Sequence, residues 1–409
     1  MPDAHPVTGL ILTGGGARAA YQIGVLQALL RLRPGPAQAP SPFPVIAGTS
    51  AGAINASALA AESDDFSRAV ARLANVWENF HADHVYRADS LGVARTGAGW
   101  LTMMSIGWII ARWRRLKPRS LLDNSPLGGL LQHMVRLERL DTLMADGHLQ
   151  ALAVSTSSYS SGQHVTFYQS RHAPTPWVRS QRLAVRTQIT VEHLMASSAI
   201  PFVFPTVQLP LAGRLEWFGD GSMRQAAPIS PAIHLGAERV LVIGAGRMHE
   251  PPGERPVSDQ PPPMAQIAGH ALSNIFLDAL AVDVERLQRI NNTLRLLPPE
   301  ALARTPLRPI DVLVIAPSQR LDDLAARHLH ALPAPVRALL RGAGVSGQGP
   351  ATQGSALASY LLFEADYTRD LIALGEADTL ARRQEVLRFF GWDGAPPADG
   401  AVSPAGARG

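Results

Sequence analysis

The sequence predicts an α/β protein with a mostly parallel central sheet covered by helices on both faces. Through the first third of the chain, short apolar runs alternate with segments of helical periodicity. Two of the apolar runs end in glycine-rich turns that lead directly into a helix. Such alternation is typical of parallel strands joined by crossover helices. With 46% apolar and 17% charged residues, the 409-residue chain can bury a large core.

The predicted elements follow one another from strand to helix. The first strand, residues 7–12, is a short apolar run closed by glycines, and residues 18–33 repeat apolar side chains at helical spacing. After a proline-rich connection, a second apolar run over residues 45–47 forms a buried strand, and residues 53–61 continue as a helix. Later strands are predicted at residues 150–155, 164–169, 215–219, 239–243 and 311–315. Later helices are predicted at residues 65–80, 125–137, 191–198, 268–290 and 355–374.

Composition excludes several classes of function. The chain has no cysteine, which rules out disulfides, thiolate zinc sites and cysteine nucleophiles. Its net charge of +4 favours anionic surfaces such as membranes. Basic and aromatic residues are not interleaved as in nucleic-acid recognition modules, and we expect no nucleic-acid partner. Residues 1–20 lack the basic start and long apolar run of a secretion signal, which predicts a cytoplasmic protein.

The sharpest local motif is Gly48-Thr-Ser50-Ala-Gly52, which follows a strand and precedes a helix. A nucleophilic serine needs a tight, strained turn of this kind, with small neighbours that let other backbone segments approach closely. The helix N-terminus also favours negative charge on the serine oxygen. We therefore interpret Ser50 as a catalytic nucleophile, with a helix-capping serine as the alternative.

A run of three glycines, Gly14, Gly15 and Gly16, closes the first strand and is followed by Arg18. Unobstructed backbone N–H groups in such a loop can stabilise the oxyanion of acyl transfer. The alternative is a dinucleotide-binding loop, because Gly14, Gly16 and Ala19 fit the loose glycine pattern of that motif. That motif expects an acidic residue about 20 positions later, and the chain has no Asp or Glu between Arg18 and Ala61.

A third motif, Gly219-Asp220-Gly221, ends the predicted strand 215–219. Strand ends of a parallel sheet meet at one edge, so that the Asp220 carboxylate would meet Ser50 there and act as its base. A turn aspartate beside glycine is the alternative interpretation. The joint occurrence of the three motifs in this order favours catalysis.

Together these motifs resemble the patatin-like phospholipase family. The resemblance rests on the run Leu-Ile-Leu-Thr-Gly-Gly-Gly-Ala-Arg that ends at Arg18, on the Ser50 motif and on Asp220-Gly221. The stretch His-Leu-Met-Ala-Ser-Ser-Ala-Ile-Pro from His193 is similar to the family's segment ahead of the aspartate, and the resemblance covers roughly residues 7–245.

This resemblance implies a three-layer α/β/α fold and a Ser-Asp catalytic dyad. Ser50 would be the nucleophile, Asp220 its base, and the glycine loop the source of oxyanion N–H groups, with no cofactor and no metal. Arg18 would fix the loop or face an anionic headgroup, and the supporting residues are Gly48, Gly52 and Gly221. Two positions depart from the family pattern. Ala19 stands where the family usually has glycine, and Ser222 stands where glycine or alanine is common.

The histidines suggest two further hypotheses. His81 and His84, and likewise His328 and His330, lie close in sequence but have no accompanying carboxylate motif of a metal site. His249 follows the predicted strand 239–243 and would complete a Ser-Asp-His order instead of the dyad.

Residues 100–119 combine large apolar side chains with a basic cluster. Trp100, Trp108 and Trp113 belong to an apolar run too short to span a bilayer, which needs about 20 residues. The basic residues are Arg112, Arg114, Arg115, Lys117 and Arg119. This combination predicts peripheral contact with a membrane, on its inner face, and a core helix with a solvated end is the alternative.

From these observations we expect a phospholipase A-like lipid acyl hydrolase. Its catalytic domain would span residues 1–320, followed by a helical region over 321–392 packed on the same domain and a disordered tail over 393–409. A carboxylesterase or thioesterase with the same dyad, and a nucleotide-binding regulatory protein, are the alternatives. The sequence contains no signal for headgroup preference or oligomeric state.

Overall fold

The computed structural model describes residues 6–36, 38–87, 120–172, 174, 177–248, 264–274, 279–342, 345 and 355–393. Three sequence predictions fall outside the described residues: the segment 100–119, His249 and the tail beyond Asp393. They therefore stay predictions.

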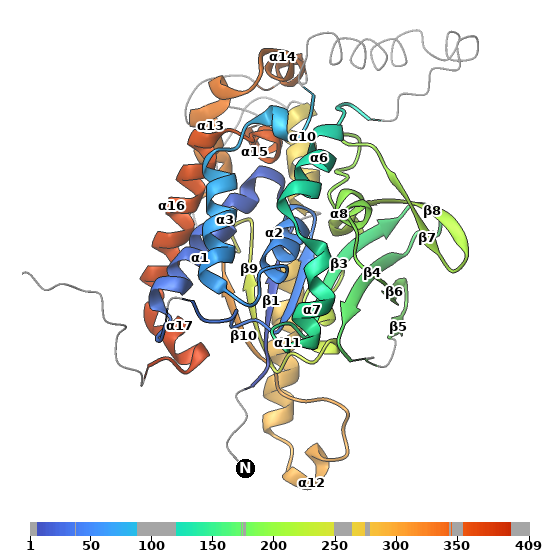
Figure 1. Cartoon of the computed structure of the whole chain (residues 1–409), viewed down its shortest axis with the longest axis vertical. Helices are drawn as coiled ribbons and strands as arrows, with labels where there is room; N and C mark the ends of the chain where they lie inside the picture. The colour runs from blue at the N-terminus through green and yellow to red at the C-terminus, as the bar shows by residue number, and fades with distance from the viewer. Residues whose placement is uncertain are drawn as a thin grey trace, which may run out of the picture.

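Ten strands of the described residues form one sheet in the order β10-β9-β1-β2-β3-β4-β6-β5, with β8 paired to β3 and β7 to β8 (Figure 1). The strands β10, β9, β1, β2 and β3 are parallel to one another, whereas β4 and β8 both run antiparallel to β3. The bounds are β1 Thr8–Leu12, β2 Val45–Thr49, β3 Ala151–Ser158, β4 His164–Ser170, β5 Val178–Arg179, β6 Arg182–Arg186, β7 Val207–Leu211, β8 Arg214–Asp220, β9 Arg239–Ile243 and β10 Asp311–Ile315.

Helices cover both faces of this sheet, which confirms the predicted three-layer α/β/α fold. Leu10 and Leu12 of β1 point into the larger core cluster, whereas Ile11, between them, belongs to a second cluster on the opposite face. The period-two alternation of a strand therefore buries both of its faces. The first face is covered by α1, α2, α3 and α16, and the second by α9 and α11.

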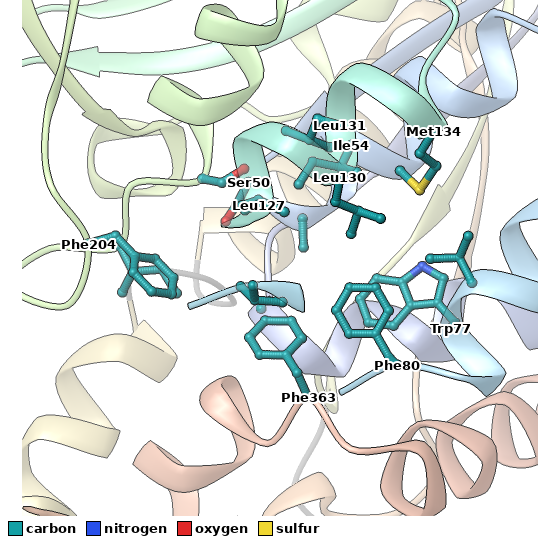
Figure 2. Close-up of a pocket in the computed structure, with 16 residues that line it drawn as sticks. Ser50, Ile54, Trp77, Phe80, Leu127, Leu130, Leu131, Met134, Phe204 and Phe363 are labelled. Carbon is teal, nitrogen blue, oxygen red and sulfur yellow. The ribbon is translucent and has the colours of Figure 1, made fainter. Parts of the chain in front are cut away.

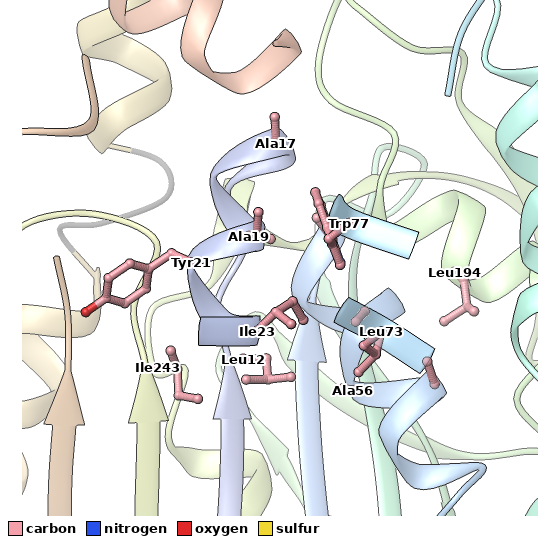
Figure 3. Close-up of a cluster of buried hydrophobic side chains, with 14 of the residues drawn as sticks. Leu12, Ala17, Ala19, Tyr21, Ile23, Ala56, Leu73, Trp77, Leu194 and Ile243 are labelled. Carbon is pink, nitrogen blue, oxygen red and sulfur yellow. The ribbon is translucent and has the colours of Figure 1, made fainter. Parts of the chain in front are cut away.

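The larger cluster joins the first helices to the sheet (Figure 3). Leu12 and Ile243 lie at the carboxyl ends of β1 and β9, and Ile23, Ala56 and Leu73, from three different helices, belong to the same cluster. The α-helices are α1 Ala20–Leu32, α2 Ala51–Ala60, α3 Phe66–Glu78, α6 Ser125–Met134, α7 Leu140–Ala145, α8 Val191–Ser197, α9 Ser230–His234, α10 Met264–Ser273, α11 Ala279–Arg295, α12 Pro299–Leu302, α13 Leu321–His328, α14 Ala334–Gly342, α15 Ser355–Leu361, α16 Ala365–Ala381 and α17 Arg383–Phe390. The 3-10 helices are η1 Gly16–Ala19, η2 Ala82–His84, η3 Leu137–Arg139, η4 Gly221–Arg224 and η6 Leu329–Ala331.

The C-terminal helices pack on the N-terminal part of the fold. Helix α16 lies along α1 and also contacts α3, and α15 lies against η1, the short helix that follows the three glycines. The hydroxyl group of Tyr21 in α1 donates a hydrogen bond to Asp378 in α16 over 3.0 Å. Helices α15 and α16 thus lie beside the first elements of the fold.

One predicted helix is wrong in extent, because it is two helices. The helix predicted over 355–374 ends at Leu361, and Glu364 is in extended conformation before α16 begins. The break allows Phe363 to turn into an apolar pocket rather than continue along a helix face. The helix predicted over 268–290 includes the last part of α10, which packs against α15, and most of α11, whose Leu280 belongs to the second core cluster; residues 275–278 lie outside the described residues.

No helix within the described part of the chain is long and apolar enough to cross a membrane.

Candidate active site

Ser50 lies at the sharp turn between β2 and α2. Its backbone has φ 57° and ψ −133°, a left-handed conformation that costs a non-glycine residue about 1–3 kcal/mol. The two flanking glycines make this turn feasible. A Cβ atom on Gly52 would lie 2.3 Å from the carbonyl oxygen of Leu12, and one on Gly48 would lie 2.4 Å from the carbonyl oxygen of Gly52. The turn therefore needs the glycines at both positions that the sequence motif singled out.

Asp220 meets Ser50 as predicted, but its strand approaches from the opposite direction. The prediction assumed a parallel strand, whereas β8 runs antiparallel to β3 and pairs Asp220 with Thr156. Strand β3 extends beyond its last pairing with β2, which joins Thr49 to Ser155. The end of β8 therefore reaches the carboxyl edge of the parallel strands from outside.

A short hydrogen bond joins the two side chains: Ser50 Oγ donates to Asp220 Oδ2 over 2.6 Å. Both residues are buried, at 1% and 0% exposure. Burial raises the pKa of Asp220 to about 6, although the hydrogen bonds from Ser50 and Ser222 work in the other direction. Near neutral pH this carboxylate is ionised and is a stronger base than an exposed aspartate.

The second oxygen of the carboxylate and the backbone of Ser50 are also held. Asp220 Oδ1 accepts a 2.9 Å hydrogen bond from the backbone N–H of Ser222. The N–H of Ser50 donates to Ser197 Oγ over 2.9 Å, and Ser197 Oγ in turn donates to the carbonyl of Ser155 over 2.7 Å. Ser197 belongs to the stretch from His193 that resembles the family, but no role was predicted for it from the sequence. A buried serine at the end of α8 has no local signature of such a contact.

The glycine loop reaches the same place. Gly16 lies beside Ser50 in the lining of one pocket, and neither Gly15 nor Gly16 donates its N–H to another described residue. Gly16 has φ +55°, and a Cβ there would lie 2.3 Å from the carbonyl oxygen of Tyr360. Gly14 is buried in the turn before it and does not line the pocket.

The supporting residues lie around the pair. A Cβ on Gly221 would lie 2.2 Å from the carbonyl oxygen of Ser155, so that only glycine fits after Asp220. Arg18 is 3% exposed and does not line the pocket; its guanidinium pairs with Asp322 and donates to Ser359 Oγ over 2.8 Å. Of the two roles expected for Arg18, these contacts favour fixing the loop.

An apolar pocket opens from Ser50 between α2, α3 and α6 (Figure 2). It is narrow, with a cavity volume of about 40 Å³. Figure 2 places Ser50 at one side and Trp77, Phe80 and Met134 at the other. The remaining side chains along it are almost all apolar and include Ile54, Val76, Val85, Leu127, Leu130, Leu131, Ile200, Phe204 and Phe363. A lining of this kind suits a hydrocarbon chain and offers nothing to phosphate or ribose.

The histidine pairs form no metal site in the described part of the chain, where no group of three or more His, Cys, Asp or Glu side chains could hold an ion. His81 Nδ1 lies 3.2 Å from Glu364, and His328 Nε2 lies 2.8 Å from Asp370. His81 thus has a carboxylate neighbour just before α16, and His328 has one within α16, which is fewer than a metal site needs.

A buried serine that faces an apolar pocket, at the edge of a sheet covered by helices on both faces, is a site suited to an apolar ligand. The chain belongs to the patatin-like phospholipase family, whose family model matches residues 10–233. The resemblance read from the three motifs is thereby confirmed. No curated protein sequence matches the chain.

Among solved structures, the chain is similar to human GIVD cytosolic phospholipase A2, with 12% identity and a TM-score of 0.41 over 94% of this chain and 60% of that one. This chain thus spans less than two thirds of the human protein. VipD from Legionella pneumophila has 13% identity and a TM-score of 0.26, over 90% of this chain and 67% of that one. A chain in the complex of full-length SpcU with full-length ExoU from Pseudomonas aeruginosa has 15% identity and a TM-score of 0.26, over 90% and 71%.

Proposed function

We propose that the protein is a lipid acyl hydrolase in which Ser50 and Asp220 form the catalytic dyad. The observation that carries the proposal is the 2.6 Å hydrogen bond from Ser50 Oγ to the buried Asp220 carboxylate, at the head of an apolar pocket. The pocket would receive the acyl chain of a phospholipid or another carboxylic ester. Family membership supports a lipid substrate.

The reaction would proceed in two halves. Asp220 accepts the proton of Ser50 Oγ while that oxygen attacks the ester carbonyl carbon, and the N–H groups of Gly15 and Gly16 stabilise the oxyanion. Collapse of the tetrahedral intermediate releases the alcohol, which takes the proton from Asp220 and leaves an acyl group on Ser50. Water then attacks the acyl carbon, giving one proton to Asp220, and the fatty acid leaves as this proton returns to Ser50.

The test measures acyl release from phospholipids, neutral lipids and short p-nitrophenyl esters. Ser50→Ala and Asp220→Asn should each lower turnover by at least about 10³-fold, and the double variant should lose little more, because the two residues act as one unit. The matched control is Ser57→Ala. Ser57 is a buried serine of α2 whose hydroxyl has no hydrogen-bond partner among the described residues, so that its loss should leave turnover unchanged.

The same panel, extended with an acyl thioester, separates the alternatives. Activity confined to short soluble esters would favour a carboxylesterase, and activity on thioesters alone a thioesterase. If Asp220→Asn kept most of its turnover while His249→Ala lost it, a Ser-Asp-His triad would replace the dyad.

A further inference from the structure

Arg18 connects the glycine loop to helices that lie far away in sequence. Its guanidinium pairs with Asp322 in α13, donates to Ser359 Oγ in α15 over 2.8 Å, and lies 3.9 Å from the ring centroid of Tyr360. A further hydrogen bond of 3.3 Å reaches the carbonyl of Ala356. All of these partners lie beyond residue 233, the last residue that the family model matches.

The loop backbone is held from the same side. The closeness of Gly16 to the Tyr360 carbonyl leaves no space for a side chain, and a Cβ on Gly15 would lie 2.5 Å from the Cβ of Ala245. The two glycines are therefore confined between the segment after β9 and the end of α15. Two residues beyond α15, Phe363 lines the pocket beside Ser50.

We propose that Arg18 is a positioning residue, through which α13 and α15 hold the N–H groups of Gly15 and Gly16 at the distance from Ser50 that an oxyanion requires. The inference rests on the proposed function of the loop. It makes the C-terminal helices part of the catalytic apparatus, although they contribute no reacting group. Arg18 is too deeply buried, and too fully engaged with Asp322 and Ser359, to bind a lipid headgroup.

A loop that is held loosely should weaken transition-state binding more than ground-state binding. A misplacement of about 1 Å at a reacting centre can cost about 10²-fold in rate. On p-nitrophenyl butyrate, a neutral soluble ester, Arg18→Met should therefore lower kcat by about 10²-fold while KM changes less than about twofold. Arg18→Lys keeps the charge but loses the planar guanidinium and its stacking on Tyr360. Its kcat should lie between those of the wild type and Arg18→Met.

The milder variants keep the test sound if Arg18→Met folds poorly. Asp322→Asn removes the charge opposite Arg18, and Ser359→Ala removes a hydrogen-bond acceptor. Each should lower the kcat of the folded protein about fivefold, and thermal unfolding checks that the protein is folded at the assay temperature. In the Arg18→Met background, Ser359→Ala should have no additional effect on kcat, because the contact is already lost. A purely structural role would instead lower the stability of each variant and leave kcat unchanged.

The matched control is Tyr21→Phe, which removes the hydrogen bond to Asp378 between the same two parts of the chain without touching the loop. It should leave kcat unchanged. Unchanged kcat in folded Arg18→Lys, Asp322→Asn and Ser359→Ala would overturn the proposal, as would a rise in KM confined to anionic phospholipid vesicles, which would return Arg18 to a headgroup role. If Ser50→Ala itself kept activity, the proposed function would fail instead, and the two failures are thus distinguishable.

Discussion

At the scale of single residues, the site combines two unfavourable features that the surrounding structure stabilises. Ser50 occupies a left-handed conformation, and its N–H is held by Ser197. Asp220 is completely buried, and two hydrogen bonds satisfy its carboxylate. Strain and burial of this kind are common where a side chain must be kept reactive rather than stable.

The first consequence concerns the pH dependence of turnover. Burial raises the pKa of Asp220 to about 6, and the side chain acts as a base only when ionised. On a soluble ester, kcat/KM should therefore rise with pH through about 6, by nearly tenfold per pH unit below this value, and level off above it. Repeating the profile with a longer ester controls for binding, and a profile that is flat from about pH 5 to about pH 8 would contradict this role of Asp220.

The same raised pKa predicts a cost in stability at higher pH. A carboxyl group whose pKa is higher in the folded than in the unfolded state makes the fold more stable when it is protonated than when it is ionised. This contribution to stability is fully present below the unfolded-state pKa and is lost as pH rises through about 6. Asp220→Asn does not titrate at this position. Its free energy of unfolding, relative to wild type, should therefore increase by about 2 kcal/mol between about pH 4.5 and about pH 7.5. Urea unfolding at the two pH values measures this, and a constant difference would refute it.

At the scale of elements, the pocket is formed by side chains from helices that are distant in sequence. Val76 and Trp77 come from α3, Leu127 and Met134 from α6, and Phe363 from the connection between α15 and α16. Stacking of Trp77 on Phe80, with ring centroids 4.9 Å apart, makes the side of the pocket away from Ser50 rigid. The length of acyl chain that fits should depend on these residues.

Shortening Met134 should lengthen the preferred acyl chain. Met134→Ala removes the end of a side chain at the far side of the pocket, and each additional buried methylene contributes about 0.8 kcal/mol. We expect the maximum of kcat/KM over a series of p-nitrophenyl esters to shift by about two carbons. Met144→Ala is the control, because Met144 is a buried methionine of α7 that does not line the pocket. Equal profiles for the two variants would exclude Met134 from chain-length selection.

Sequence reasoning succeeded where a residue's requirement is local. Ser50 and its two glycines share one turn, so their spacing alone predicts that turn. The direction of β8 was not predictable, since an apolar run has the same pattern in either direction. The break before Phe363 was missed for a similar reason: Leu361, Leu362 and Phe363 are all apolar, and only their packing against the pocket distinguishes them from a continuing helix.

At the scale of the whole molecule, the first and last parts of the chain form one structure. Helix α16 lies along α1, and the partners of Arg18 lie more than 300 positions later in α13 and α15. The sequence of the last third contains helical periodicity but no motif, and its role depends on contacts that only the tertiary structure reveals. The region 321–392 is predicted from sequence to pack on the same domain, and Arg18 contacts Asp322 and Ser359 across the proposed boundary.

Strand β3 provides a final consequence. One edge of β3 pairs with β4, and the other edge pairs first with β2, which leads to Ser50, and beyond Ser155 with β8, which ends at Asp220. The Ser155 carbonyl also accepts the hydrogen bond from Ser197. During folding, Ser50 and Asp220 therefore cannot meet until β2 and β8 have both paired with this one edge of β3. These pairings close loops of about 100 and about 60 residues, which are slow events of high contact order. A newly synthesised chain thus lacks the Ser50–Asp220 pair until its central sheet is assembled, and we expect its partly folded forms to be inactive.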